Sequence, residues 1–385
     1  MAVIPTEGAI SAALYLTTAL STVSSTDDEV SNFSTDCIQV MHQDYPDDPI
    51  STEVEHLIGK IREAIVMPIL FVTGVMGSVV SLVAFYRQNL NNRINLCLFS
   101  LELVNLINIS FLFILNFDSL YRPFDEGDIG VVGAFVTNSK MLGMLGFMYG
   151  AMFLSAVVSC ERCFSVLFPL HSKTLISTKV ILIVIIFGSC LTVIPFFVVT
   201  WSYQVVCFHD IVTNVVVHEP TPGDFYFQYQ EVISIIEGTY YGIILSIGIP
   251  IVVVISTALT GWKLNQSIAF RKETSTSDTK KETAITKMLV TLSIEFLVLS
   301  LPNIIIRIIH LFEPEVRFAG RYNNSYFLLV NIAETGSILN SSIDFFVYYS
   351  AGTKFRDTVH EMFPCLHRKS SHPQIQGKKQ HNTYL

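Results

Sequence analysis

The sequence predicts an all-α membrane protein: a seven-transmembrane helix bundle followed by a short C-terminal amphipathic helix. Of its 385 residues, 51% are hydrophobic and only 15% are charged, whereas about a quarter of residues are charged in ordinary soluble domains. The apolar residues also form long blocks with few charges, each near the ~20 residues that a helix needs to cross a bilayer. Such blocks are predicted to be helices because a helix satisfies its own backbone hydrogen bonds in lipid. The expected spans are 64–85, 94–117, 140–161, 180–201, 238–262, 288–310 and 326–350.

The charge distribution predicts the orientation of these spans. Residues 1–60 and the connections after spans two, four and six are rich in acids, and their basic residues are Lys60, Arg122, Arg317 and Arg321. Lysine and arginine dominate the other loops and the C-terminal tail. By the positive-inside rule, we expect the N-terminus outside the cell and the C-terminus in the cytosol. The net charge of −8 therefore reflects an uneven distribution, and it does not indicate nucleic-acid binding.

Four segments are expected along the chain. Residues 1–60 should form a disordered acidic extracellular tail, for which a cleaved signal peptide is the less favoured alternative. Residues 61–350 should form the membrane domain, 351–364 a cytosolic amphipathic helix, and 365–385 a cytosolic tail. Glycosylation sequons place acceptor sites at Asn32 and Asn323, both on the expected outer side.

The end of span three carries the most informative motif, Glu161-Arg162-Cys163 with Val166, Pro169 and Leu170 behind it. An acid and an arginine stand side by side where the apolar run meets polar sequence. Charges at such a depth are costly and tend to be functional. Proline lacks an amide donor, so the helix should end at Pro169.

Spans two and seven contain polar side chains that should face the bundle. Glu102 and Asn105 lie three residues apart on one face of span two. Span seven has a polar stripe at helical spacing, with members Glu334, Ser337, Ser341, Asp344 and Tyr348, and with Asn340 beside it. Interhelical hydrogen bonding would explain the serines, but it does not explain two carboxylates.

These positions resemble rhodopsin-like (class A) G-protein-coupled receptors over about residues 60–363. The resemblance includes the Glu161 to Leu170 motif, Pro250 in span five, and Phe296 with Pro302 in span six. The motif at the end of span three together with the Asn340 to Tyr348 stretch looks most like invertebrate FMRFamide-type peptide receptors and molluscan chemosensory receptor-like sequences.

The chain also departs from the family at several positions. Asn105 stands where the family has an acid, Ser300 where it has a tryptophan, and Asp344 with Phe345 where it has Asn-Pro. These exchanges affect residues that take part in activation. They leave open a receptor-like fold that does not couple to G proteins.

The resemblance implies a plasma-membrane receptor that signals to a heterotrimeric G protein by movement of its sixth helix. Arg162 and Phe168 would belong to the G-protein surface, and Phe296, Pro302, Asp344 and Tyr348 to the switch. We expect a resting-state clamp of Arg162 with Glu161 and Glu282, although Glu282 could equally be a solvated charge. Asn105, Asn340 and Asp344 would form a polar core in which a sodium ion is the one expected cofactor.

The ligand site is expected in the outer half of the bundle. The residues chosen for it are Lys140, Met144, Glu237, Asn303, Arg307, His310 and Glu334. Two acids and two bases there suit a peptide or a small zwitterionic chemosensory ligand. Internal pairing, for example of Lys140 with Glu334, is an equally weighted alternative.

Cysteine positions predict a disulfide that differs from the family's usual bridge. That bridge joins the second outer loop to the outer end of span three, where this chain has Thr137. Cys37 and Cys207 are the two cysteines on the expected outer side, which is oxidising. Their bridge would hold the tail across the ligand site as a lid, and two free thiols or an intermolecular bridge in a dimer are the alternatives. Cys365, just after the amphipathic helix, is a candidate palmitoylation site.

The sequence contains no phosphate-binding loop, metal-ligand spacing or nucleophile elbow, so no enzyme activity is expected. A transporter or channel remains an alternative class, in which Glu102, Glu295 and Asp344 would line an ion path. The motif at Glu161–Leu170 favours the receptor.

Overall fold

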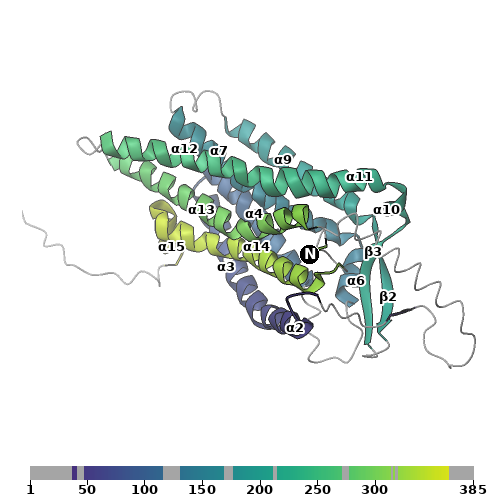
Figure 1. The fold of residues 1–385 in the computed structure, drawn as a ribbon. Coiled ribbons are helices and arrows are strands. Elements are labelled where there is room, and N and C mark those ends of the chain that lie inside the picture. Colours follow the sequence, from purple (N-terminus) through teal and green to yellow (C-terminus); the bar gives the residue numbers. More distant parts are fainter. Residues whose placement is uncertain are drawn as a thin grey trace, which may run out of the picture.

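The computed structural model describes residues 37–40, 47–115, 131–168, 177–210, 215–270, 277–313, 315–316 and 320–363. Within these ranges, six helices are long and apolar enough to cross a membrane. The helices lie side by side as an elongated bundle (Figure 1), with a small sheet at one end and the short helix α15 at the other. We call these the hairpin end and the α15 end.

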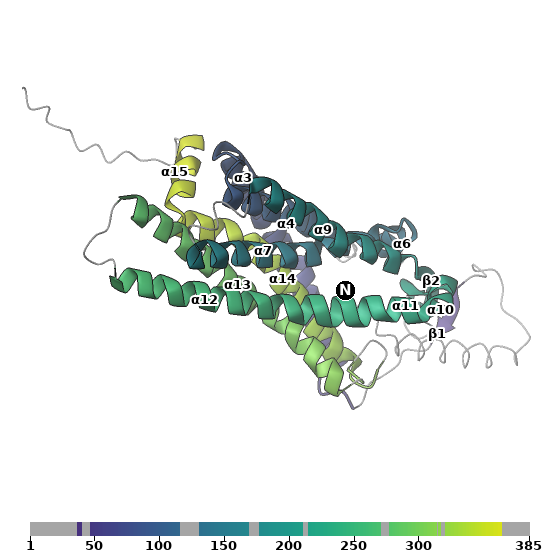
Figure 2. The same ribbon diagram turned by 90° about the horizontal axis from the view of Figure 1, so that it is seen from above.

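The six helical rods have the following composition. The first joins α2 (Thr52–Ile61), a π-helical turn (Arg62–Val66) and α3 (Met67–Arg87). The second is α4 (Arg93–Leu115) and the third a 3₁₀ turn (Met141–Leu145) with α7 (Gly146–Leu167). The fourth is α9 (Thr178–Thr200), and the fifth joins α11 (Gln230–Ser234), a π-helical segment (Ile235–Gly248) and α12 (Ile249–Phe270). The sixth is α13 (Ser277–Phe312), and Figure 2 shows α11 and α12 in line along one edge of the bundle.

The predicted seventh span corresponds to α14 (Asn323–Ala351), a helix of 29 residues that packs against α13 and α3. It is less apolar than the six rods because it carries Glu334, Asp344 and several serines. It is therefore not one of the six helices that are long and apolar enough to cross a membrane. Its path along the bundle is that of a spanning helix, but the seventh crossing remains a prediction.

The short helix α15 (Thr353–Met362) follows α14 after Gly352. Phe355 and Val359 are buried, and the ring of Phe355 lies 5.2 Å from that of Phe85 on α3. A short helix with one apolar face therefore exists where the sequence predicts it. That it lies on a membrane surface remains a prediction.

The segment predicted as a disordered tail contains ordered elements. Strand β1 (Ile38–Val40) lies inside residues 1–60, and helix α2 has all but its last residue there. The first turn of α2 holds Glu53 and Glu55 and its last turn holds Lys60, which is the charge order that the helix dipole favours. The helix then continues into the first apolar rod, so the prediction of disorder was wrong for these residues.

The sheet at the hairpin end has the order β1-β2-β3. Strands β2 (Tyr203–Asp210) and β3 (Val215–Pro222) form an antiparallel hairpin, and β1 pairs in parallel with β2. Short helices α6 (Val131–Asn138) and α10 (Asp224–Gln228) lie beside it. The sheet covers the end of the bundle at which the ligand site was expected.

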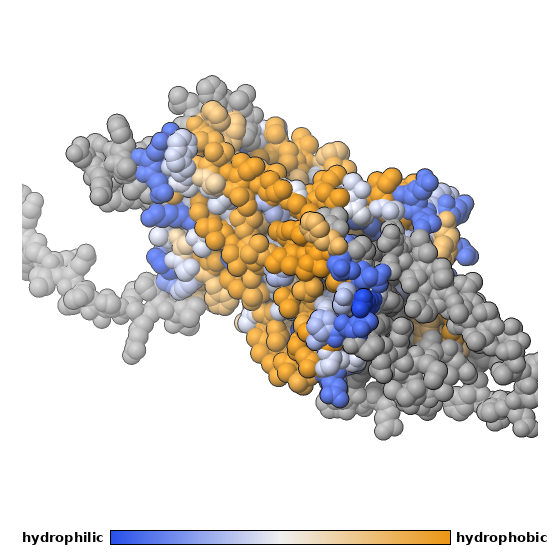
Figure 3. All heavy atoms as spheres, viewed as in Figure 1, coloured by the Kyte–Doolittle hydropathy of each residue, from blue (hydrophilic) through white to orange (hydrophobic). Residues whose placement is uncertain are grey.

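The outer surface of the bundle is apolar. Large apolar side chains are exposed along the rods, for example Met76 on α3 and Phe187 on α9, and they form a continuous belt between polar ends (Figure 3). Trp201 and Trp262 are 61% and 58% exposed near opposite ends of the bundle, where tryptophan commonly marks the membrane interface.

Candidate functional site

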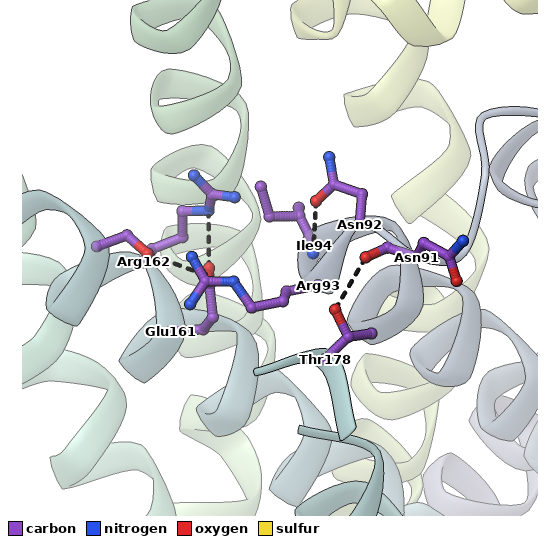
Figure 4. Close-up of polar contacts among 8 residues, drawn as sticks. Asn91, Asn92, Arg93, Ile94, Glu161, Arg162 and Thr178 are labelled. Atoms are coloured by element: carbon purple, nitrogen blue, oxygen red, sulfur yellow. Dashed lines mark hydrogen bonds and ion pairs between the residues drawn. The ribbon is translucent and has the colours of Figure 1, made fainter. Parts of the chain in front are cut away.

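At the α15 end, Glu161 lies between two arginines (Figure 4). Its Oε2 is 3.2 Å from Nε of Arg162, and its Oε1 is 3.8 Å from Nη2 of Arg93. The hydroxyl of Ser165 donates a hydrogen bond of 3.0 Å to Oε1. Glu161 and Arg162 are 5% and 6% exposed, so the carboxylate compensates two arginine charges in a nearly dry environment.

The turn before α4 positions Arg93. The amide of Ile94 donates to Oδ1 of Asn92 at 3.1 Å, and Thr178 at the start of α9 donates through its hydroxyl to the carbonyl of Asn91 at 2.9 Å. Figure 4 shows these contacts beside the arginines. They hold the first residues of α4 next to α7, so the side chain of Arg93 lies beside Glu161.

The Glu161–Arg162 contact that the sequence predicts is therefore present, with a second cation that sequence reasoning missed. The only available signal for Arg93 was a lone basic residue at the start of an apolar block. Glu282 lies on α13, but its side chain is outside the described residues. Another contact links the same helices, since the hydroxyls of Ser159 and Ser293 are 2.7 Å apart.

The remaining residues expected in the switch lie at different depths. Phe168 follows α7 and is 51% exposed at the α15 end. Tyr348 is fully buried and its ring packs edge-on against Phe85. Phe296 is buried in the apolar core of the hairpin-end half, and Pro302 lies inside α13.

In the middle of the bundle, Asn105 and Asp344 form one polar site, as the sequence predicts. Nδ2 of Asn105 donates to Oδ2 of Asp344 at 2.8 Å, and Ser341 donates to Oδ1 of Asn105 at 3.1 Å. All three side chains are buried. Asn340 is half-buried and shares no hydrogen bond with this site in the described part of the chain.

Glu102 is a second buried acid near this site. It is fully buried beside the hydroxyls of Ser78 and Tyr348. Neither of its carboxyl oxygens has a hydrogen-bond partner among the described residues, and the same holds for Glu295 on α13. Buried acids in the membrane interior are costly, and they tend to mark functional positions.

At the hairpin end, the π-helical segment turns Glu237 into the protein. Glu237 is 3% exposed and accepts a hydrogen bond of 2.9 Å from the hydroxyl of Tyr203. Ser246 donates to the carbonyl of Tyr241 at 2.7 Å, which satisfies an acceptor in the widened helix. Arg307 on α13 attracts Glu237 electrostatically without a direct ion pair in the described part of the chain.

The tyrosines around Glu237 were missed by sequence reasoning, because isolated aromatic residues in loops carry no distinctive pattern. Burial raises the pKa of Tyr203 far above its ordinary value, and the Glu237 carboxylate raises it further. Burial and then Glu237 raise the pKa of Tyr226 to about 12. Both phenols therefore stay protonated and can donate hydrogen bonds at any physiological pH.

Lys140 and Glu334 are paired internally, but not with each other. Nζ of Lys140 donates to the carbonyl oxygen of Tyr203 at 2.9 Å. Glu334 forms an ion pair of 3.0 Å with Nη1 of Arg62. Nη2 of Arg62 lies 3.5 Å from Oε1 of Glu63. Arg62 was overlooked because it precedes the first apolar block by two residues.

The other residues expected at the ligand site are spread around it. Met144 is half-buried and packs against the core of the hairpin-end half. Asn303 is half-buried on α13, and Nδ1 of His310 is 3.4 Å from the carbonyl of Val316. The structure therefore gathers Glu237 and Arg307 with tyrosines, and it places Lys140 and Glu334 in other contacts.

The segment before α2 is fastened to the hairpin end at two points. Cys37 and Cys207 form a disulfide, which is the pairing predicted from the sequence. Farther along, Asp48 accepts hydrogen bonds from the hydroxyl and amide of Ser325 at 2.6 and 3.1 Å, and from the amide of Ile50 at 3.0 Å. Burial opposes ionisation of Asp48, but these hydrogen bonds prevail and lower its pKa.

Two of the predicted modification sites, Asn32 and Cys365, lie outside the described residues. Asn323 is the first residue of α14, near the fastening at Ser325. In the described part of the chain, no group of three or more histidine, cysteine or acidic side chains could hold a metal ion.

Comparison with known proteins identifies the family. Residues 145–366, more than half of the chain, match the family of serpentine type 7TM GPCR chemoreceptors named Srw. None of the curated proteins matches the chain. The match begins beside the outer end of α7 and includes the Glu161–Arg162 motif, the polar centre of α14 and α15. The chain is therefore a member of the Srw family of serpentine chemoreceptors, and it is a receptor rather than an enzyme.

Proposed function

We propose that this receptor binds an extracellular ligand at the hairpin end and signals to a heterotrimeric G protein at the α15 end. The observation that carries the proposal is the buried Glu161–Arg162 pair with Arg93 beside it. An arginine held by a neighbouring carboxylate at the end of a spanning helix can be released when the helices separate. Released, it would be available to a cytosolic partner.

The proposed movement is an outward swing of α13 at the α15 end. Pro302 removes a backbone hydrogen bond inside α13, which allows a hinge there. The Ser159–Ser293 contact of 2.7 Å would break in the swing. Arg162 and the exposed Phe168 would then contact the G protein, and Glu282 would leave the neighbourhood of Arg162.

The proposal includes the orientation and environment of the chain. The receptor would lie in the plasma membrane as a multi-pass protein, with its N-terminus outside and α15 on the cytosolic leaflet. The excess of acids at the hairpin end and of bases at the α15 end supports this orientation. Glycans on Asn32 and Asn323 and a palmitoyl group on Cys365 would fit the same orientation. We also propose that this receptor is related to FMRFamide-type peptide receptors.

A sodium ion is proposed for the polar centre. The Asp344 carboxylate, held by Asn105 with the Ser341 hydroxyl nearby, provides the oxygen donors that hard cations prefer. Bound sodium would stabilise the resting arrangement of α4 and α14. Ligand affinity that does not change when sodium is replaced by choline would refute this part of the proposal.

A second candidate function is transport, because Glu102 and Asp344 are buried, the half-buried Glu295 has buried carboxyl oxygens, and the three acids lie on different helices. The family match favours the receptor. A flux assay on purified protein in vesicles separates the two functions, since a receptor should move no ion or solute.

The decisive experiment is a screen of peptide and amino-acid libraries on cells that express the chain, with calcium and cAMP readouts. We expect at least one ligand to signal through the wild type and not through Arg162→Ala at matched surface expression. Glu282→Ala should raise the signal without ligand if the predicted clamp exists. A receptor that binds a ligand but activates no G protein would contradict the coupling proposal.

A further inference from the structure

The internal pairings leave one acid and one base at the hairpin end. Lys140 donates to the carbonyl of Tyr203, and Glu334 pairs with Arg62. Lys140 also forms no ion pair in the described part of the chain, but its ammonium group is held by that carbonyl. Glu237 and Arg307 form no ion pair there, and each keeps a buried side-chain atom without a hydrogen-bond partner among the described residues. The site therefore offers one negative and one positive group.

Both groups retain hydrogen-bonding capacity. Oε1 of Glu237 accepts from Tyr203, while its Oε2 is buried and has no hydrogen-bond partner among the described residues. Nε of Arg307 is in the same situation, and its Nη2 lies 3.5 Å from the hydroxyl of Tyr149. A contact of 3.5 Å is long for a hydrogen bond. Buried polar atoms are rarely left unsatisfied in a working protein, so these atoms indicate a missing partner.

Glu237 and Arg307 lie within electrostatic reach of each other, but they do not form a direct ion pair. They come from different rods, the π-helical segment before α12 and the outer part of α13. A partner that satisfies both must carry a positive group for one and a negative group for the other.

Tyrosines surround the two charges. Tyr203 and Tyr226 lie near Glu237, and Tyr326 lies near Arg307. Aromatic rings attract cations, and the protonated phenols can donate hydrogen bonds to a carboxylate. The neighbourhood thus matches an organic ion of both signs better than a purely apolar ligand.

Two described residues before α2, Cys37 and Asp48, fasten this part of the chain at the hairpin end. The disulfide holds it to β2, and the Asp48–Ser325 contacts hold it to the start of α14. Both fastenings are at the hairpin end, close to the charged groups.

We propose that the ligand of this receptor is a small zwitterion, an α- or ω-amino acid, that bridges Glu237 and Arg307. Its ammonium group binds Oε2 of Glu237, and its carboxylate binds the guanidinium of Arg307, which matches carboxylates with two parallel donors. A peptide with several charges would leave some of them unpaired and desolvated, which is costly. This inference rests on the proposed ligand site and narrows its chemistry.

The first test uses purified full-length receptor and its thermal unfolding. The probes are the common α-amino acids and the ω-amino acids β-alanine and γ-aminobutyrate, each beside its N-acetyl and C-amide derivatives. A ligand that binds the folded state raises the unfolding temperature in proportion to its occupancy. We expect at least one free zwitterion to stabilise the wild type and both blocked forms to bind roughly tenfold more weakly or worse. Blocked forms that bind as well as the free zwitterion, or no effect from any probe, would overturn the inference.

The second test assigns each charge to one end of the ligand. In Glu237→Gln, the N-acetyl derivative should bind as well as the free amine, while the preference for the carboxylate over the amide remains. In Arg307→Gln, the C-amide derivative should bind as well as the free carboxylate, while the preference for the free amine over the N-acetyl derivative remains. Glu231→Gln, on the exposed face at the start of α11, and Arg87→Gln, at the far end of α3, are matched charge controls that should behave as wild type. Wild-type preferences in both site variants would refute the placement. If a variant does not fold, the blocked ligands on wild type still decide.

Failure of this inference differs from failure of the proposed function. Zwitterion binding with no G-protein activation would refute coupling and leave the ligand class standing. Activation by an uncharged molecule or a long peptide, with no zwitterion bound, would refute the ligand class and leave the receptor function standing.

Discussion

Replacing Glu161 by glutamine should raise signalling in the absence of ligand. Glutamine keeps the size and shape of the side chain but removes the negative charge that lies 3.2 Å from Arg162 and 3.8 Å from Arg93. The two arginines would then lie close together without a compensating acid. Arg162 would leave its resting position more easily, and the receptor would reach its active arrangement more often.

The size of this effect follows from the geometry. Two unit charges about 4 Å apart interact by about 4 kcal/mol at an effective dielectric constant of about 20. Desolvation cancels part of this attraction, and removing one partner of a buried pair typically costs about 3–5 kcal/mol. The active state still keeps some of these interactions through water. If the substitution destabilises the resting state by about 1–3 kcal/mol more than the active state, the active population rises by about 5- to 150-fold.

The assay is G-protein activation without ligand in cells, normalised to surface expression. Arg93→Gln is the matched variant, because it removes the competing cation and leaves Arg162 the sole arginine on Glu161. Its basal signal should be at or below that of the wild type. Equal basal signals of Glu161→Gln and wild type at equal surface expression would refute the reasoning. A rise in Arg93→Gln as large as in Glu161→Gln would show that Arg162 is not the residue being held.

Three further predictions concern the fastenings at the hairpin end and the polar centre. Cys37→Ser should make the N-terminal segment cleavable by added protease without reductant, whereas wild type should become so only after reduction. Asn105→Asp should place two acids at the 2.8 Å contact and lower stability by about 2–4 kcal/mol, and adding Asp344→Asn should restore the unfolding temperature; no recovery would mean that the two residues are not coupled. The pKa of Asp48 in the folded state lies below its ordinary value of 3.8. The stabilisation that its carboxylate gives to the folded state is therefore complete above pH 3.8, and it is lost as the pH falls through the folded-state pKa. Protease resistance of the segment should therefore persist at pH 5 and weaken near pH 3, and Asp48→Asn should abolish that pH dependence.

The sequence predicts the helical rods well, because a bilayer imposes length and apolarity on each of them. The six apolar helices correspond to the first six expected spans, and the helices of the first, fifth and sixth begin well before their predicted bounds. The extension through α2 could not be anticipated because its residues are polar enough for a tail. Its stability depends on continuing into α3 and packing against α14.

Contacts between side chains were harder to predict. The Asn105–Asp344 pair and the disulfide follow from residues that have few suitable partners in the chain. Lys140 has many carbonyls within its reach, and it bonds to one on β2 that no pattern indicates. Glu334 could have met several bases, and the choice of Arg62 depends on how far the first rod continues beyond the membrane. Local spacing identifies which side chains need partners, while the packing of the rods decides which partners they find.

The two fastenings of the N-terminal segment join residues that are made at very different times during synthesis. Cys37 is separated from its partner by 170 residues, and Asp48 from Ser325 by 277. At about 5–20 residues per second, the ribosome needs about 14–55 s to make the chain between Asp48 and its partner. The contacts of Asp48 with Ser325 are thus among the last long-range contacts that the growing chain can form. The wait for the partner of Cys37 is shorter, about 9–34 s at the same rate, because Cys207 lies 170 residues later in the chain. A receptor in which β2 does not reach the N-terminal segment would keep the thiol of Cys37 unpaired, and cellular quality control could recognise the defective chain by it.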